Sequence, residues 1–490
     1  MTLPYLTDDC IYYILQHLQN DRRNYTIKET IRSRTNNINF DEEYKPLFKY
    51  LKYLENYNYF MVNSIICRWL YCSKLLFSPN KIWDDIIPIF QQSILRQSEN
   101  IKQLDILLQL FYSESFKNFN IQNFTSNLTR LNSLSLLLKG YDYITNNEIE
   151  QEILTNISNI SLNLRKLIIK LPRTQRLLFQ NSTSNNNLIN NNSMEKFCTI
   201  IQKQNKLKIF KITNCFSFLK NILLSLEFQH HSLVHIEFIK CDFNNINLKS
   251  LNNLYNLKYL LFEICKGLLL NQCEILKFTS FKLKGLSFKR DLWNVDVTSL
   301  MVKYLGSSLL NLLIENPTIP LIENISLYCP NLVFLKIRIN LHMDLSVLSF
   351  FNNLRIRILE LHISYYYSNN INEFFIKLAN NIPINIINIS IHLLNSNNFL
   401  IFLRFKEFLE NCHNNFEIIN LNHIIELQFL KIILNYIERS NNNNLKILGM
   451  TKLDKELNNE ELKLLNQIKS KGIKIVDYYS LYGGFNMMVI

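Results

Sequence analysis

The sequence predicts an α/β fold: a solenoid in which a curved parallel sheet alternates with helical or irregular return segments, preceded by a small α-helical module. Two observations predict it. A phrase of apolar residues, L-x-x-L-x-L in its loose form, recurs along most of the 490 residues. The first 95 residues lack this phrase and show the apolar spacing of helices instead. We therefore expect one repeat array with a separate module at its amino end.

The first element of the chain has the signals of a helix start. The stretch LPYLTDDCIYYILQHL begins with Leu3 and Pro4 and then offers Asp8 or Asp9 as a helix cap. This cap precedes apolar residues at steps of three and four, which is the spacing of an amphipathic helix. These apolar residues are Ile11, Ile14, Leu15 and Leu18.

A second helix-like apolar run, YNYFMVNSIICRWLYCSKLLFSPNKIWDDI, occupies residues 57–86. It contains Val62, then Ile66 and the pair Arg68-Trp69, and later Trp83. The order of an LP pair, an acidic cap, a short amphipathic helix, an Arg-Trp helix and a later Trp resembles the F-box family. This chain departs from the family pattern by a polar insertion near residues 20–55.

The resemblance implies a function for these helices. An F-box docks onto a Skp-type adaptor, which links it to a cullin ubiquitin ligase. Contact of this helix-in-groove kind needs only a few apolar anchors at helical spacing. The alternative is a helical cap on the repeat array whose apolar residues form only its own core. The residues that the resemblance implies for adaptor contact are Leu3, Pro4, Ile11, Ile14, Leu15, Leu18, Ile66 and Trp69.

Three segments follow from this reading. We expect the F-box-like helical module at residues 1–95, a helical linker at 96–130 and the repeat array at 131–490. The array has about 13 units, counted from the first place of each phrase. These first places are Leu131, Leu164, Leu207, Leu233, Leu257, Leu283, Leu309, Leu332, Ile356, Ile384, Phe416, Leu445 and Ile473.

The period and the phrase predict one short strand in each unit. A strand alternates its side chains, so the apolar fourth and sixth places point inward and the third, fifth and seventh places point outward. One strand cannot bury its apolar side alone, but stacked copies form a parallel sheet with a shared core. From Leu207 to Ile356 the units are 23 to 26 residues long. This period resembles that of leucine-rich repeats, which run 20 to 29 residues.

The ninth place of the phrase also repeats. It is Cys215, Cys241 and Cys265, then Asp291, and Asn340 in the repeat that starts at Leu332. In leucine-rich repeats this place holds a residue that turns inward and satisfies backbone groups at the strand end. A metal site is the alternative, but zinc usually takes close C-x-x-C pairs. We favour the structural ladder.

Two stretches interrupt or end the array. The Asn-rich NSTSNNNLINNNS at residues 181–193 falls in the longest unit, and we expect an exposed loop there. The sequence ends in VDYYSLYGGFNMMVI, which we expect to cap the open end of the stack.

Composition excludes several protein classes. Hydrophobic residues make up 48% and charged residues 19%, a globular balance. The start, MTLPYLTDDC, lacks the basic and apolar regions of a signal peptide, and no apolar run reaches the ~18 residues of a membrane helix. We therefore expect an intracellular protein, in the cytoplasm or the nucleus, whose 10 cysteines are mostly reduced.

The sequence offers little material for catalysis. It has no G-x-x-x-x-G-K-[ST], H-E-x-x-H or G-x-S-x-G motif. His423 and Glu426 are three residues apart without a second histidine at metal spacing, so we interpret them as surface residues. We expect a protein that is not an enzyme and that has no metal or cofactor.

The predicted outward places of the repeats are the candidate binding surface. Across the seven units from Leu207 to Ile356 they carry four basic and four acidic residues, with aromatic residues between them. A phosphate backbone favours a coherent basic stripe, and mixed charge with aromatics suits a protein partner better. The target-binding candidates are Lys211, His235, Glu237, Tyr259, Glu263, Lys289, Glu315, Phe334, Lys336, Arg338, Glu360 and His362.

These features give a leading hypothesis and two alternatives. The leading one is a substrate-recognition subunit of an SCF-type ubiquitin ligase, in which the repeats hold a target protein that the sequence leaves unidentified. The first alternative is a leucine-rich-repeat scaffold without a role in ubiquitin transfer. The second is nucleic-acid binding, suggested by the net charge of +13 but disfavoured by the balanced strand face.

Overall fold

The computed structural model describes residues 54–72, 79–112, 116, 119–138, 148–172, 191–340, 344–364, 371–394, 400–439 and 444–481. The chain divides into two compact units, Met1–Leu233 and Val234–Ile490. The expected first helix, at residues 3–18, lies outside the described residues. Within the described ranges, no helix has the length and apolar character needed to cross a bilayer.

The described part of the first unit is a parallel sheet whose strands follow the order of the chain. Its strands are β1 (Asn56–Asn58), β2 (Gln103–Leu107), β3 (Ser133–Leu137), β4 (Lys166–Lys170) and β5 (Ile209–Thr213). The α-helices between them are α3 (Tyr59–Cys72), α4 (Pro79–Gln97), α5 (Ile121–Ser126), α6 (Glu148–Ile160), α7 (Asn191–Gln202) and α8 (Leu219–Leu226). Short 3-10 helices are η2 (Leu108–Tyr112), η4 (Asn127–Arg130) and η5 (Glu227–Gln229).

The second unit continues the same design with parallel strands paired in chain order. The strands are β6 (His235–Ile239), β7 (Tyr259–Glu263), β8 (Gly285–Lys289), β9 (Asn311–Glu315), β10 (Phe334–Asn340), β11 (Ile358–Ser364), β12 (Asn388–Leu394), β13 (Ile418–Ile424), β14 (Ile447–Thr451) and β15 (Lys474–Asp477).

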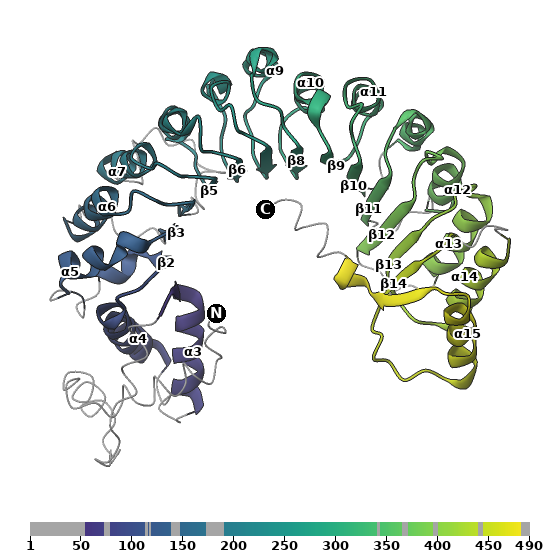
Figure 1. Ribbon diagram of the computed structural model, residues 1–490, viewed down its shortest axis with the longest axis horizontal. Helices are drawn as coiled ribbons and strands as arrows, with labels where there is room; N and C mark the ends of the chain where they lie inside the picture. The colour runs from purple at the N-terminus through teal and green to yellow at the C-terminus, as the bar shows by residue number, and fades with distance from the viewer. Residues whose placement is uncertain are drawn as a thin grey trace. The chain divides into compact units, whose positions relative to one another are not determined.

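Helical segments return the chain between these strands. They are η6 (Leu248–Leu251), α9 (Leu270–Cys273), η7 (Glu274–Phe278), α10 (Val295–Leu305), η8 (Gly306–Ser308), α11 (Ile319–Tyr328), η9 (Leu345–Asn353), α12 (Ile371–Asn381), α13 (Leu400–Asn411), α14 (Leu427–Arg439) and α15 (Asn459–Ser470). Within this unit the strands lie along one side and the return helices along the other (Figure 1). These helices confirm the predicted helical return segments.

The core of the second unit lies between the strands and the returns, as the phrase predicts. The sixth places of three successive repeats are Phe238, Phe262 and Phe288, and all three are buried. Phe262 stacks on Phe238 with ring centroids 5.7 Å apart and on Phe288 at 5.8 Å. Trp293 meets the ring of Phe262 edge-on at 5.4 Å. Because each buried Phe contributes about 1.5–3 kcal/mol, this stack stabilises adjoining repeats together.

Each of several strands ends in the same turn. The residue directly after the strand has a positive φ although it is not glycine: Lys240 at 52°, Ile264 at 56°, Arg290 at 54° and Asn316 at 45°. This conformation redirects the backbone so that the next residue turns inward. Asn tolerates it, whereas a β-branched residue such as Ile264 is strained there.

In the repeats that start at Leu233, Leu257 and Leu283, the inward residue after this turn is the ninth place, and its hydrogen bonds confirm the structural ladder there. The prediction was wrong for Asn340, which is the exposed last residue of β10, because this strand runs on without the turn. The thiol of Cys265 lies 3.3 Å from the carbonyl oxygen of Phe238 in the preceding repeat, to which it donates. The thiol of Cys241 donates to the carbonyl of Ile239 at 3.5 Å. In the next repeat Asp291 accepts from the backbone N–H of Cys265 at 2.8 Å. These side chains therefore satisfy backbone groups at the strand ends.

The repeat array begins earlier than expected. Strand β2 lies within residues 96–130, for which the sequence suggested a helical linker, and β1 lies within 1–95. Ile101, Leu104 and Ile106 fit the apolar phrase and are buried. Leu104 pairs with Tyr57 on β1 and with Leu134 on β3, so these residues belong to the sheet.

Two further expectations need correction. The phrase that we placed at Ile384 starts at Ile386, because Leu359 pairs with Ile389 and Ile384 is 80% exposed. The run INIINISI fits the phrase in both registers, and a shift of two residues keeps the same face inward. The expected loop at 181–193 ends sooner, since α7 begins at Asn191, and residues 181–190 lie outside the described ranges.

Candidate protein-binding face

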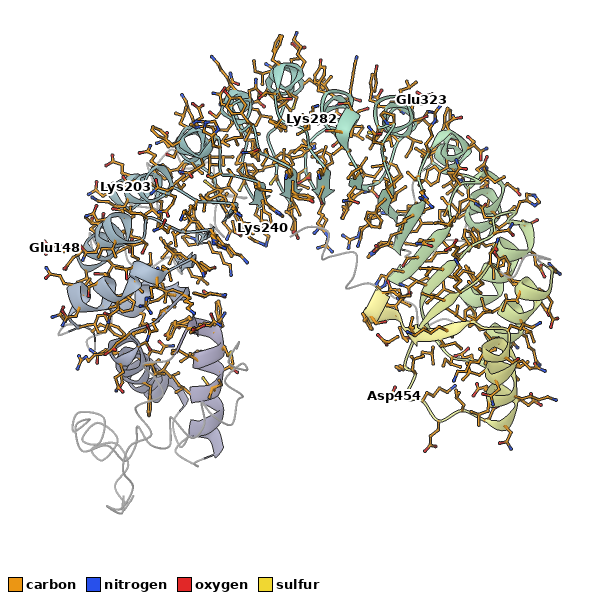
Figure 2. The ribbon with its side chains drawn as sticks, in the orientation of Figure 1. Glu148, Lys203, Lys240, Lys282, Glu323 and Asp454 are labelled. Atoms are coloured by element: carbon orange, nitrogen blue, oxygen red, sulfur yellow. The ribbon has the colours of Figure 1, made fainter. Side chains whose placement is uncertain are left out.

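The outward side of the sheet in the second unit is formed by the third, fifth and seventh places of strands β6 to β12, and we call it the strand face. The return helices pack on the opposite side of this sheet (Figure 1). Lys240, at the end of β6, lies on the strand side, whereas Glu323 of α11 lies on the return side (Figure 2). The strand face is therefore the side of the sheet that a partner could reach without displacing a return helix.

Apolar and aromatic side chains stand among polar ones at the outward places of the strand face. Leu313 is the fifth place of β9 and is half-buried. Its neighbour in the register on β10 is Lys336, and on β8 it is Ser287. Phe334 and Tyr259 are half-buried third places on β10 and β7. Apolar groups mixed with charges are a composition that suits a protein partner.

Ion pairs join adjacent strands on the same face. Arg338 Nη1 on β10 donates to Glu315 Oε1 on β9 at 2.8 Å. Lys336 Nζ on β10 lies 2.6 Å from Glu360 Oε1 on β11. Since these two cations are bound by carboxylates of the chain itself, they do not form a continuous positive track.

Glu360 is the most buried charge of the strand face, with 2% exposure. The same Oε1 that meets Lys336 also accepts from His362 Nε2 at 2.6 Å. Burial alone would raise the pKa of Glu360, but the hydrogen bonds from His362 and Lys336 and the charge of Lys336 outweigh it and lower the pKa. Burial lowers the pKa of His362, although its bond to Glu360 opposes that shift. Glu360 therefore stays ionised.

A second polar pair lies on β6, at the start of the unit. His235 Nε2 is 3.0 Å from Glu237 Oε1, and the His235 ring is 5.9 Å from the ring of Tyr259. His235 is 5% exposed. Only a small part of the His235 side chain is therefore exposed to a partner.

The strand face changes character towards β12 and beyond. His392 is the seventh place of β12, and its ring lies 4.8 Å from that of His362. Its Nδ1 is 3.0 Å from the hydroxyl of Tyr478, which directly follows β15. Burial first, and then the nearby charges of His362 and Lys336, lower the pKa of His392 to about 4. This imidazole is therefore neutral at pH 7.

The structure brings some of the predicted target-binding residues together and leaves others apart. Lys336 and Arg338 contact Glu360 and Glu315 as the alternation predicts. Glu263 and Lys289 pair in register on β7 and β8 and are half-buried. Lys211 lies on β5, which belongs to the first unit.

The predicted adaptor-binding residues are mostly beyond what the structure describes. Leu3, Pro4, Ile11, Ile14, Leu15 and Leu18 lie outside the described residues, and of Trp69 only the backbone, within α3, is described. Ile66 on α3 is fully buried. Ile66 therefore belongs to the interior of the chain itself, and α3 instead exposes Phe60 at 54% and Met61 at 40%.

Sequence reasoning missed several residues of the strand face. Leu313 occupies a fifth place that we had not singled out, because an isolated leucine carries no charge signal. His392 was missed because the outward places were inspected only in the units from Leu207 to Ile356; counted from Ile386, it is the outward seventh place of the next unit. Tyr478 could not have been found, because nothing in the spacing links it to a strand 86 residues away.

The geometry of the repeats decides the fold. One phrase gives one parallel strand, its fourth and sixth places are buried, and its ninth place satisfies the backbone at the strand end. The protein is a leucine-rich-repeat solenoid. Such repeats present a continuous sheet surface to partners.

No family model and no curated protein sequence matches the chain. Among solved structures, the Rad7–Elc1 complex of yeast is 15% identical over 98% of this chain and 99% of that chain, with a TM-score of 0.39. An internalin, InlF, of Listeria monocytogenes is 14% identical over 79% and 88%, with a TM-score of 0.30. The leucine-rich-repeat ectodomain of the receptor kinase GASSHO1/SCHENGEN3 from Arabidopsis thaliana is 13% identical over 67% and 40%, at 0.25.

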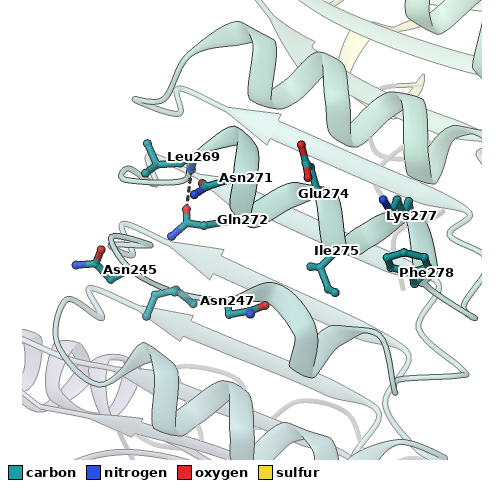
Figure 3. A pocket seen from close by; sticks show the side chains of 10 residues that line it. Asn245, Asn247, Leu269, Asn271, Gln272, Glu274, Ile275, Lys277 and Phe278 are labelled. Atoms are coloured by element: carbon teal, nitrogen blue, oxygen red, sulfur yellow. Dashed lines mark hydrogen bonds between the residues drawn. The ribbon is translucent and has the colours of Figure 1, made fainter.

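A hollow of about 540 Å³ opens on the return side of this solenoid, between successive returns (Figure 3). Gln272 at its edge accepts from the N–H of Leu269 at 2.7 Å and donates to the carbonyl of Phe243 at 3.2 Å. Its polar side chain therefore builds the turn into α9. The remaining lining residues are Asn245, Ile246, Asn247, Asn271, Glu274, Ile275, Lys277 and Phe278.

The described residues contain no cluster of three or more histidine, cysteine or acidic side chains placed to hold a metal ion. Burial disfavours the thiolate of Cys215 and Cys273 and raises the pKa of each to about 12. These thiols therefore remain protonated and pack as part of the core.

Proposed function

We propose that this protein is a non-catalytic substrate-recognition subunit of an SCF-type ubiquitin ligase. Its amino-terminal module would bind a Skp-type adaptor and, through it, a cullin, and the strand face would hold a target protein. The mechanism is proximity: a rigid array keeps the target near a conjugating enzyme and raises its effective concentration. Such a subunit would act in the cytoplasm or the nucleus.

The observation that carries the target-binding half is the composition of the strand face. Leu313, Phe334 and Tyr259 supply apolar area, and ion-paired charges lie on the same face. Protein interfaces concentrate their binding energy in a few such residues within a polar rim. Nucleic-acid binding would need unpaired cations in a row, and Lys336 and Arg338 are each held by a carboxylate.

The adaptor-binding half rests on the order of sequence features in residues 1–95 that resembles an F-box. Phe60 and Met61 add exposed apolar area on α3. The second candidate, a scaffold without a role in ubiquitin transfer, is favoured by one fact: Ile66 is buried in the chain's own interior. The two candidates differ in whether the adaptor binds.

The test is binding of the purified full chain to a purified Skp-type adaptor by calorimetry. We expect a stable complex, and we expect Leu15→Asp and Trp69→Ala each to weaken it by about 2 kcal/mol or more, as for buried anchor residues. Glu373→Ala on return helix α12 is the control, because its i,i+4 pair with Lys377 is on the return side, and it should bind as the natural chain does.

The outcomes separate the two candidates. Failure of the folded full chain to bind the adaptor, while it retains its far-UV circular dichroism spectrum and melting temperature, would remove the ligase proposal and leave the scaffold. Binding that survives deletion of residues 1–95 would also contradict the proposed role of the module.

A further inference from the structure

The carboxyl-terminal end of the described chain turns back onto the outward side of the sheet. β15 ends at Asp477, and residues 478–481 form one helical turn. Asp477 builds this turn locally, since its Oδ2 accepts from the N–H of Tyr479 at 2.8 Å and its carbonyl accepts from the Ser480 hydroxyl at 2.6 Å. An aspartate that bonds backbone two residues ahead fixes the direction of a turn.

This turn points one tyrosine inward and the next outward. Tyr478 is 0% exposed, whereas Tyr479 is 62% exposed. The Tyr478 ring stacks on His392 at 5.7 Å with an interplanar angle of 29°, and its hydroxyl meets His392 Nδ1 at 3.0 Å. The His392 ring in turn lies against His362. A side chain from the end of the chain thus continues a row of rings across β12 and β11.

Small outward residues on β12 and β14 leave room for this turn on the sheet. The fifth places are Lys336 on β10 and Glu360 on β11, but Ser390 on β12 and Gly449 on β14 are small. A Cβ at Gly449 would lie 2.9 Å from Leu481 Cδ1 and would also clash with the amide of Asn420 on β13. Leu481 therefore fills space that only a glycine leaves open. Figure 1 shows the yellow end of the described chain beside β13 and β14.

This seat lies beside residues that were predicted to contact a target, since the His392 ring lies against His362. Glu360 and His362 are 2% and 5% exposed. The fifth places Ser390 and Asn420 are 5% and 2% exposed. By contrast, the fifth places Ser287, Leu313 and Lys336 on β8 to β10 are half-buried. The outward fifth places are therefore half-buried over β8 to β10 and buried over β11 to β14, whereas outward places at the strand ends, such as Asn388 and His392, are half-buried.

We propose that the turn Tyr478–Leu481 is a built-in occupant of the sheet over β12 to β14, and that a ligand reaches this part of the surface only by displacing it. The proposal deepens the proposed function, because it assigns a regulated part to the target-binding surface. Whether this turn occupies the sheet does not depend on ubiquitin transfer, so the position of the turn is tested separately.

The first experiment measures occupancy by acylation of histidines with diethylpyrocarbonate, followed by mass spectrometry of the full chain. His392 should react slowly in the natural protein, and exposed His413 serves as the internal reference. In Tyr478→Ala the rate at His392 should rise by about tenfold or more, as for a site released from a buried contact. Tyr479→Ala is the matched control and should leave the rate unchanged.

A second variant separates loss of the contact from loss of folding. Tyr478→Phe keeps the ring and its stacking but removes the hydroxyl at His392, so it should give an intermediate rate with an unchanged melting temperature. If His392 reacts equally in the natural chain, Tyr478→Ala and Tyr478→Phe, the turn is not an occupant and the proposal is wrong.

The second experiment tests whether the turn Tyr478–Leu481 excludes a defined peptide ligand from the sheet. A fluorescent peptide of residues 478–490 is titrated into the full chain and into a chain that ends at Asp477. The peptide should bind the shortened chain and bind the full chain at least about tenfold more weakly, because the tethered turn competes at high effective concentration. The same peptide with Tyr478→Ala should bind neither.

Two results would overturn the proposal: equal binding of the peptide to both chains, or no binding to the shortened chain while its melting temperature is preserved. Neither result depends on a Skp-type adaptor. Loss of adaptor binding alone would therefore remove the proposed ligase role and leave this inference standing.

Discussion

Single residues at the strand ends carry local strain that the repeat pattern imposes. In several repeats a sharp turn after the strand lets the ninth place point inward, and Lys240, Ile264, Arg290 and Asn316 adopt positive φ to make it. For most residues the left-handed conformation costs about 1–2 kcal/mol. Ile264 is the least suited of the four, because its β-branched side chain crowds the backbone.

Replacing Ile264 with asparagine should stabilise the protein by about 1 kcal/mol, since asparagine tolerates the left-handed conformation that Asn316 already uses at the equivalent place. The midpoint of urea unfolding measures the change. Ile264→Val is the control, because it keeps the β-branch and should give no gain. A midpoint for the asparagine variant no higher than that of the valine variant would contradict the account.

Asp291 is a second residue whose position conflicts with its chemistry. Its Oδ1 accepts from Cys265 N–H, while Oδ2 is buried and makes no hydrogen bond. Burial raises the pKa of this carboxyl to about 8, with smaller contributions from the charges of Glu315 and Glu263 and opposition from the Cys265 N–H. The folded chain therefore holds a proton that the unfolded chain releases near pH 4.

This difference predicts a pH dependence. Because the folded state binds more protons than the unfolded state between about pH 4 and pH 8, Asp291 lowers stability as the pH rises through that window. Asp291→Asn keeps the acceptor for Cys265 and cannot ionise. The melting temperature of the variant should exceed that of the natural protein at pH 8, and the difference should shrink at pH 5. A difference that is constant with pH would refute the assigned protonation.

Repeated elements are held together by stacked side chains more than by any one repeat. Phe262 contacts Phe238, Phe288 and Trp293, which come from the repeats on both sides. Neighbour contacts of this kind dominate the stability of repeat arrays. The sequence predicted most at the scale of these elements. Alternating apolar residues specify a strand and its inward face, and the recurrence of this phrase at repeat intervals specifies which strands are neighbours.

Replacing Phe262 with alanine should cost about 3–5 kcal/mol, because it removes a fully buried ring and leaves a cavity between three repeats. Phe278→Ala is the matched control, since Phe278 on η7 is 66% exposed and its loss should change stability by less than about 0.5 kcal/mol. Urea unfolding of both variants measures the difference. Similar losses in the two variants would show that the stack does not join the repeats.

Particular elements also show why the pattern did not predict everything. Strand β2 fits the phrase from Ile101, but we interpreted that region as a linker; its partner β1 precedes it by more than one repeat period, so the spacing gave no signal. At INIINISI two registers satisfy the phrase, and only pairing with β11 selects Ile386. The strand face could be predicted from alternation, whereas its closure could not, since it depends on Tyr478 reaching back across many residues.

At the scale of the whole molecule, the balance of basic and acidic residues on the strand face favours a protein partner over a nucleic acid. The chain carries a net charge of +13, yet on the strand face Lys336 and Arg338 are held by Glu360 and Glu315. Excess charge spread over a surface assists solubility and encounter, but it does not create a phosphate-binding stripe. Leu313 and Phe334 are the outward apolar residues of the second unit that are best suited to contact a protein.

The central claim, that the strand face binds a protein, is tested most directly by photo-crosslinking in cells of the source organism. The photoreactive residue p-benzoylphenylalanine is placed at Leu313 on the strand face, and separately at Leu327 on return helix α11, which is 70% exposed. We predict a discrete crosslinked protein from position 313 and none from position 327. Crosslinks from 327 alone, or crosslinks from 313 to nucleic acid only, would contradict the account.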